Sequence, residues 1–269
     1  MYRQILVPVS EPTEVEPLIR FAAMLLDSDG EVRVLHIIPT TTLPEVTREW
    51  RASVNLVVPA HEAAAALDLR VDPEVRASTD VPGEILESAE SHGVDAILMT
   101  LRGDKRSRNP FVGHTASGIL HHAHADVLIL NRLALTEGRV PRVLLPSFRS
   151  TPLPRAMQVA EEIAVHNDGA TVTTISLGPR GPGEPDDVPD REERTARGVP
   201  VTHKRSWLAG SFVRRGRFPG LILQAAQRER FGLLLVSEEG DLAGGALLTR
   251  PFLEDLFRAA PCPVLALRS

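Results

Sequence analysis

Short apolar runs alternate with longer amphipathic stretches along the chain. Runs of strand length occupy residues 4–9, 32–38, 69–77, 96–99 and 126–130. Because most of these runs are almost continuously apolar, they fit strands that are buried on both faces of a parallel sheet. The stretches between them carry apolar residues every three or four positions, which is typical of helices that cover such a sheet. The pattern therefore predicts an α/β fold.

The first half is predicted to hold four helices. They are expected at about residues 13–26, 45–67 and 81–92, and from His114 onward. Thr13 suits the N-cap of the first helix, since Glu16 follows three residues later. Pro59 is expected to kink or interrupt the second helix, because proline has no N–H group to donate.

The second half repeats the first. Residues 142–146 (RVLLP) echo residues 4–8 (QILVP), and matching positions lie 137 to 139 residues apart throughout. A constant offset of this kind indicates a tandem repeat. We therefore expect two domains, residues 1–136 and residues 140–269, each built on a Rossmann-like, five-stranded parallel sheet.

One segment departs from the repeat. Residues 180–198 are rich in Gly, Pro, Asp, Glu and Arg, where the first half carries its long Ala-rich helix. This composition predicts a flexible surface loop. The helix after the loop is expected over Phe218–Arg228.

Between residues 96 and 130, a strand is followed by a glycine-containing loop, a helix and a second strand. Gly103 and Gly113 stand at the two ends of the loop, and basic residues including Arg106 lie between them. Glycine lets the backbone approach an anion, and a helix N-terminus presents free N–H groups and the positive end of its dipole. The arrangement favours the binding of a phosphate group.

The spacing resembles the nucleotide-binding motif of the universal stress protein family, in which Gly, two residues, Gly, nine residues and Gly precede Ser or Thr. Here the order is Thr100, two residues, Gly103, nine residues, Gly113 and His114. The two glycines match, whereas Thr100 replaces a glycine and His114 replaces a hydroxyl residue. Thr115 offers a hydroxyl group one place later.

The resemblance covers both halves and implies adenine nucleotide alpha hydrolase-like domains, with ATP or another adenine nucleotide at the strand edge of the first. Ser10 replaces the acidic residue that the family carries after its first strand. The alternative is that the glycines only allow a tight turn and that the basic run is a solvated loop. The nucleotide-binding residues expected from the resemblance are Pro8, Val9, Ser10, His36, Thr100, Gly103, Arg106, Gly113, His114 and Thr115.

The second domain is poorly equipped for the same ligand. In its aligned loop, Arg250 stands in place of the third glycine and is followed by Pro251, which lacks an N–H donor. Glu238 and Glu239 add negative charge that would repel phosphate. We expect no ordinary ATP binding there, and one hypothesis is that the Arg250 side chain fills the vacant pocket.

The composition limits the kinds of partner that the protein is expected to bind. A net charge of −5 and 4% aromatic residues argue against a nucleic-acid surface. No apolar run is long enough to span a bilayer, and the N-terminus does not resemble a signal peptide, so we expect a cytoplasmic protein without membrane insertion. Cys262 is expected to be a buried apolar residue. His121, His122 and His124 lack a carboxylate or thiol at ligand spacing, so no metal site is predicted.

The resulting hypothesis is a universal stress protein-like binding or regulatory module, and a slow ATPase at most, because no residue is placed as a base for water. A nucleotide would order the Arg106 loop and change the surface shown to a partner. The alternatives are an interaction scaffold that binds no nucleotide and a cytosolic regulatory domain related to a transporter. The strands at Asp126–Leu130 and from Pro263 to residue 267 are expected to pair the two halves and to support a homodimer.

Overall fold

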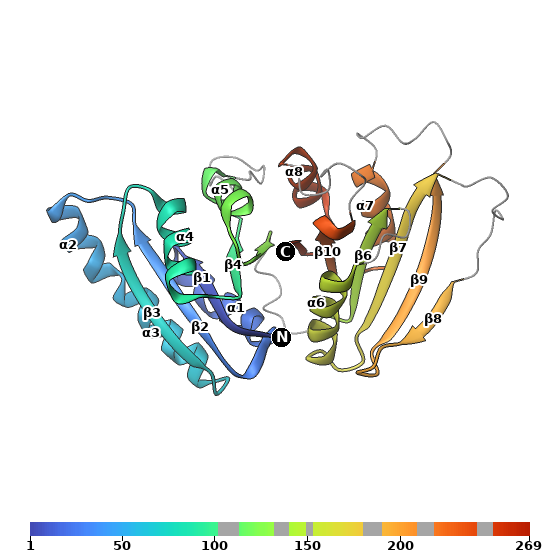
Figure 1. Ribbon diagram of the computed structural model, residues 1–269, viewed down its shortest axis with the longest axis horizontal. Coiled ribbons are helices and arrows are strands. Elements are labelled where there is room, and N and C mark those ends of the chain that lie inside the picture. Colours follow the sequence, from blue (N-terminus) through green and yellow to red (C-terminus); the bar gives the residue numbers. More distant parts are fainter. Residues whose placement is uncertain (102–112, 132–139, 149–152, 180–189, 209–217, 241–249) are drawn as a thin grey trace. The chain divides into compact units, whose positions relative to one another are not determined.

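The computed structural model describes residues 1–101, 113–131, 140–148, 153–179, 190–208, 218–240 and 250–269 (Figure 1). The chain forms two compact units. The first comprises Met1–Arg102 and Phe111–Thr136, and the second consists mainly of Glu137–Arg268.

The first unit is a parallel sheet with the strand order β3-β2-β1-β4-β5. The central strands are the most apolar, and Ile5, Leu6, Ile97 and Leu98 are fully buried. The α/β prediction is therefore confirmed for this unit. Its strands are β1 (Tyr2–Val9), β2 (Leu26–Ile38), β3 (Arg70–Ala77), β4 (Ala96–Thr100) and β5 (Asp126–Leu130).

The described residues of the first unit form five helices, and α1 packs with α3 while α4 packs with α5 (Figure 1). The long helix predicted after the second strand is divided in two at Ser53, whereas Pro59 lies inside a continuous α3. The prediction of an interruption at Pro59 is thus wrong. The Ser53 hydroxyl donates to the Glu49 carbonyl at 3.0 Å, beside the Ser53 N–H group, which donates to the same carbonyl at 2.9 Å. The helices are α1 (Pro12–Ala23), α2 (Leu43–Ala52), α3 (Val54–Ala65), α4 (Val81–His92) and α5 (His114–His122).

The first helix begins earlier than predicted. Its N-cap is Glu11 rather than Thr13, and Glu14 at position N3 completes a capping box. Pro12 at the first helical position explains the shift, because its fixed φ suits that position and its missing N–H group would have no helical partner there.

The second unit repeats the topology with the strand order β11-β10-β6-β7-β9-β8. Its strands are β6 (Arg142–Phe148), β7 (Thr171–Pro179), β8 (Arg191–Arg194), β9 (Pro200–Leu208), β10 (Leu233–Ser237) and β11 (Val264–Arg268). Its helices are α6 (Pro154–Val165), α7 (Phe218–Arg228) and α8 (Arg250–Ala259), with the short 3₁₀ turn η2 (Glu238–Gly240) after β10.

The loop predicted over residues 180–198 is wrong in its last part. β8 pairs antiparallel with β9, so this unit carries one strand more than the five predicted. A tight turn joins the two strands, with Gly198 at a φ of +80° and its N–H group donating to the Thr195 carbonyl at 2.9 Å. All four residues of β8 are exposed, so the strand contains no apolar run from which it could have been predicted. Residues 180–189 lie outside the described part.

Candidate nucleotide site

A cavity of about 460 Å³ opens at the carboxyl ends of β1, β2 and β4 in the first unit. Parallel strands bring these ends to one edge of the sheet, where open α/β sheets bind their ligands. The volume falls in the range of small-molecule sites. The lining residues are Pro8, Val9, Ser10, Glu14, Leu35, His36, Ile37, Ile38, Pro39, Glu49, Val81, Ile85, Met99, Thr100, Leu101, Gly113, Thr115 and Ala116.

Most of the residues expected at the site line this cavity. His114 does not: it is the exposed first residue of α5. Gly103 and Arg106 lie outside the described residues, so their part in a site stays a prediction. The structure brings together Pro8, Val9, Ser10, His36, Thr100, Gly113 and Thr115.

Glu14 is the polar centre of the cavity wall, and the sequence reasoning missed it. The residue is 8% exposed. One carboxylate oxygen accepts from the Thr100 hydroxyl at 2.8 Å. The other accepts from the Ser10 N–H group at 3.0 Å, the Ser10 hydroxyl at 3.0 Å and the Glu11 N–H group at 3.1 Å. These bonds tie the ends of β1 and β4 to the N-terminus of α1.

This network fixes the direction of two hydroxyl groups. The hydroxyl groups of Ser10 and Thr100 each donate their hydrogen bond to Glu14. Their oxygen atoms can therefore act only as acceptors toward the cavity. His36 adds to this polarity, because its Nδ1 atom lies 3.1 Å from the Val9 carbonyl oxygen. A proton on Nδ1 would satisfy that carbonyl and leave Nε2 of a neutral ring as an acceptor. This end of the cavity therefore suits ligand groups that donate hydrogen bonds.

The opposite chemistry lies at the N-terminus of α5. Gly113 is the N-cap, and no side chain caps the helix there. A Cβ atom added to Gly113 would meet nothing within 4 Å. The first N–H groups of a helix have no intrahelical acceptor and carry partial positive charge. The α5 terminus thus offers donors and open space to an anion.

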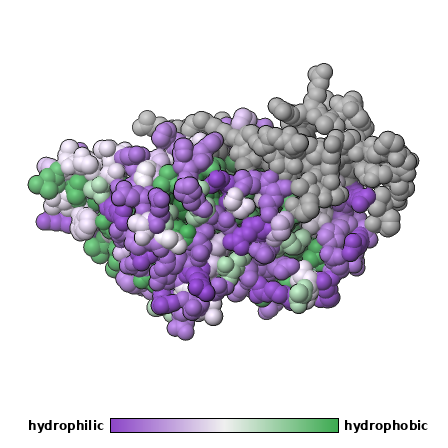
Figure 2. All heavy atoms as spheres, in the orientation of Figure 1, coloured by the Kyte–Doolittle hydropathy of each residue, from purple (hydrophilic) through white to green (hydrophobic). Residues whose placement is uncertain are grey.

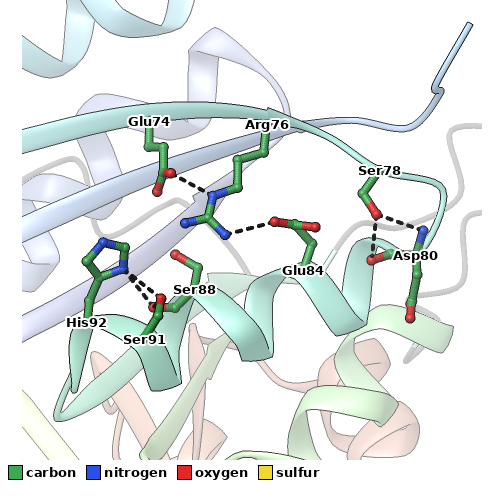
Figure 3. Close-up of polar contacts among 8 residues, drawn as sticks. All are labelled: Glu74, Arg76, Ser78, Asp80, Glu84, Ser88, Ser91 and His92. Atoms are coloured by element: carbon green, nitrogen blue, oxygen red, sulfur yellow. Dashed lines mark hydrogen bonds and ion pairs between the residues drawn. The ribbon is translucent and has the colours of Figure 1, made fainter.

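The cavity wall formed by α4 is held by a helix cap and by ion pairs to β3. Asp80 caps this helix by accepting from the Gly83 N–H group at 3.1 Å. Arg76 on β3 donates to Glu74 at 2.6 Å and to Glu84 of α4 at 2.8 Å (Figure 3). These hydrogen bonds, first that to Glu74 and then that to Glu84, raise the pKa of Arg76. The helix that carries Val81 and Ile85 is fixed in place.

The corresponding place in the second unit is built differently. Glu239, just after β10, accepts from the N–H groups of Arg155 at 3.0 Å and Ala156 at 2.9 Å, at the start of α6. Arg250 and Pro251 open α8. The Arg250 side chain lies outside the described part, so the hypothesis that it fills a pocket stays a prediction.

Other residues singled out in the sequence have plain positions. Cys262 is buried, as predicted. His121 is exposed, and its Nδ1 atom lies 2.7 Å from the Ser117 carbonyl oxygen. Within the described ranges, no three His, Cys, Asp or Glu side chains gather closely enough to hold a metal ion. The described helices include none with the length and apolar character to cross a membrane.

Sequence comparison identifies relatives of the first unit. The sequence model of the universal stress protein family matches residues 1–131. Universal stress protein G of Shigella flexneri and that of Escherichia coli O157:H7 are each 28% identical over 144 residues, covering 48% of this chain and 99% of the relative.

Solved structures match the whole chain. A universal stress protein from Archaeoglobus fulgidus DSM 4304 has a TM-score of 0.65 at 16% identity, over 98% of this chain and 95% of that one. The cytoplasmic domain of a prokaryotic cation chloride cotransporter has a TM-score of 0.59 at 10% identity, over 99% of this chain and 95% of that one. At such identities the likeness shows a shared fold.

Proposed function

We propose that the chain is a member of the universal stress protein family, whose sequence model matches residues 1–131, and that it is a regulatory module whose first domain binds an adenine nucleotide. In this proposal the domains are residues 1–136 and 140–269, and the second binds no nucleotide. Binding shifts the population of conformations that a partner meets.

The observation that carries the proposal is that one cavity wall combines three kinds of chemistry. Ser10 and Thr100 offer acceptors to which the hydroxyl groups of a ribose would donate. The N–H groups at the start of α5, after Gly113, suit a phosphate. Apolar side chains such as Ile38 and Ile85 suit a flat base.

The proposal is tested by heat denaturation of the purified chain with and without ATP or AMP. A ligand at 100 times its dissociation constant adds about 2.7 kcal/mol to the free energy of unfolding. We expect such a shift in the wild type and its loss in Gly113→Arg, because the new side chain would fill the space beside the α5 N-terminus.

Gly220→Arg is the matched control. Gly220 lies in α7 of the second unit, and a Cβ atom there also meets nothing within 4 Å. This variant is expected to keep the full shift. A shift that persists in Gly113→Arg would contradict the proposed site. No shift with either nucleotide in the wild type would favour the scaffold alternative, including the form related to a transporter domain.

A further inference from the structure

The helices α2 and α3 carry an uncovered apolar stripe. Leu43 is 77% exposed, Trp50 53%, Val54 57% and Val58 47%. These positions are seven, four and four residues apart and therefore share one helical face. Across the described residues, Val165 is the one other large apolar side chain with this degree of exposure. Figure 2 shows hydrophobic residues gathered at the left of the view, where Figure 1 draws α2.

The stripe runs without a break from one helix into the next. The Ser53 N–H group donates to the Glu49 carbonyl at 2.9 Å, and the Val57 N–H group donates to the Ser53 carbonyl at 3.1 Å. None of the described side chains of α2 is buried. A helix of 10 residues is marginal in water without tertiary packing, so this helix gains stability from a surface that covers its apolar face.

The charges beside the stripe are arranged for a second copy of the same helix. Glu49 and Arg51 precede and follow Trp50, so they lie about 100° to either side of it. Arg48 shares the side of Arg51, and Glu45 shares the side of Glu49. One flank therefore carries Arg51 and the other carries Glu49, which also pairs with Arg48 of its own chain at 3.2 Å. The Arg51 side chain makes no hydrogen bond or ion pair to another described residue, which leaves it available to a partner.

We propose that the α2–α3 stripe is a self-association surface on which two copies of this chain pair their α2 helices side by side and in the same direction. A twofold axis along the helices then sets the basic flank of each copy against the acidic flank of the other. An antiparallel pair would bring like charges together. The surface is small, so a weak dimer is expected.

The experiment is sedimentation velocity of the full chain over a wide range of concentrations. Trp50→Glu puts a carboxylate into the seam and is expected to weaken dimerisation by at least about 30-fold, as for a central tryptophan anchor. Val165→Glu makes the same change at an exposed valine of α6 and should leave dimerisation unaltered. Association through Asp126–Leu130 would be insensitive to Trp50→Glu, and that result would overturn the proposal.

Charge exchange tests whether the partner is the chain itself. Arg51→Glu alone and Glu49→Arg alone each set like charges together twice and should weaken dimerisation about tenfold. A mixture of the two variants places opposite charges at both contacts and should dimerise like the wild type. Rescue by mixing cannot arise from misfolding of either variant. The proposal fails if mixing does not rescue, if the wild type stays monomeric, or if the stripe instead binds lipid vesicles through Trp50.

Discussion

Both units place a carboxylate at the N-terminus of their first helix, but they supply it from opposite sides. In the first unit, Glu14 comes from the first helix and receives the hydroxyl group of Thr100 at the end of β4. In the second unit, Glu239 comes from the end of β10 and receives two N–H groups at the start of α6. Both units have an anionic side chain at the N-terminus of their first helix, but it is supplied by a different element in each unit.

Because the carboxylate comes from a different element in each unit, the two units differ in how well they could bind a phosphate. In the first unit, the segment after β4 leads to Gly113, an open N-cap. In the second unit, the segment after β10 begins with Glu238 and Glu239, whose charges oppose a phosphate. In the second unit the carboxylate that caps the helix also lies in the segment that a phosphate would approach, whereas in the first unit it lies on the helix itself.

The largest predicted effect concerns these carboxylates. Glu14→Ala would leave the Thr100 hydroxyl and the N–H groups of Ser10 and Glu11 without their acceptor in a partly buried place. We expect a loss of about 2–3 kcal/mol in the free energy of unfolding of the first unit. Glu239→Ala removes a partly buried helix cap and should cost the second unit about 1 kcal/mol. Urea denaturation followed by the fluorescence of Trp50 and Trp207 measures both.

Glu16→Ala is the control for the first of these variants. Glu16 lies on the same helix, is 58% exposed and pairs with Arg20 at 2.9 Å. Its loss should cost no more than about 0.5 kcal/mol. Equal losses for Glu14→Ala and Glu16→Ala would show that the buried network contributes nothing particular to the fold.

A second pair of sites sharpens the comparison. In the first unit, Arg76 is a cation that lies between two carboxylates, Glu74 of β3 and Glu84 of α4. The second unit places a carboxylate, Glu229, between two cations, Lys204 on β9 and Arg142 on β6. Burial alone would raise the pKa of Glu229, but hydrogen bonds from Lys204 and Arg142 hold it below the ordinary value.

The smaller predicted effect is the acid sensitivity of this carboxylate. Because its pKa is lowered on folding, Glu229 stabilises the second unit above the ordinary glutamate pKa of 4.5, and the contribution is lost as the pH falls through the lowered value. Glu229→Gln should therefore cost about 1 kcal/mol or less near neutral pH and nothing in stronger acid. Denaturation at a series of pH values measures this, and a constant difference would contradict it.

The hydrophobic pattern was enough to predict most strands and most helices. Runs such as residues 96–99 are apolar because both faces of the sheet are covered, so their burial can be predicted from the sequence directly. The burial of Cys262 was predicted in the same way, from the apolar residues around it. The tandem repeat followed from a constant offset, which needs no knowledge of packing.

Other features depend on contacts that no local pattern records. Glu14 looked like one of three acidic residues at the start of a helix, and its role arises from Thr100, which is 86 residues away. A Glu-Pro pair followed by a glutamate at N3 was the available signal for the cap. All four residues of β8 are exposed, so the strand has no pattern of apolar residues that would predict it. The two helices meet at Ser53 and not at the more obvious Pro59, which lies inside a continuous α3.

The most direct test of the account is the number of adenine nucleotides bound per chain, measured by isothermal titration calorimetry. The account predicts one nucleotide for the wild type and for Gly220→Arg, and none for Gly113→Arg, because the first unit has an uncapped helix N-terminus at Gly113 that lines its cavity. Two nucleotides per chain, or one that survives Gly113→Arg, would contradict it.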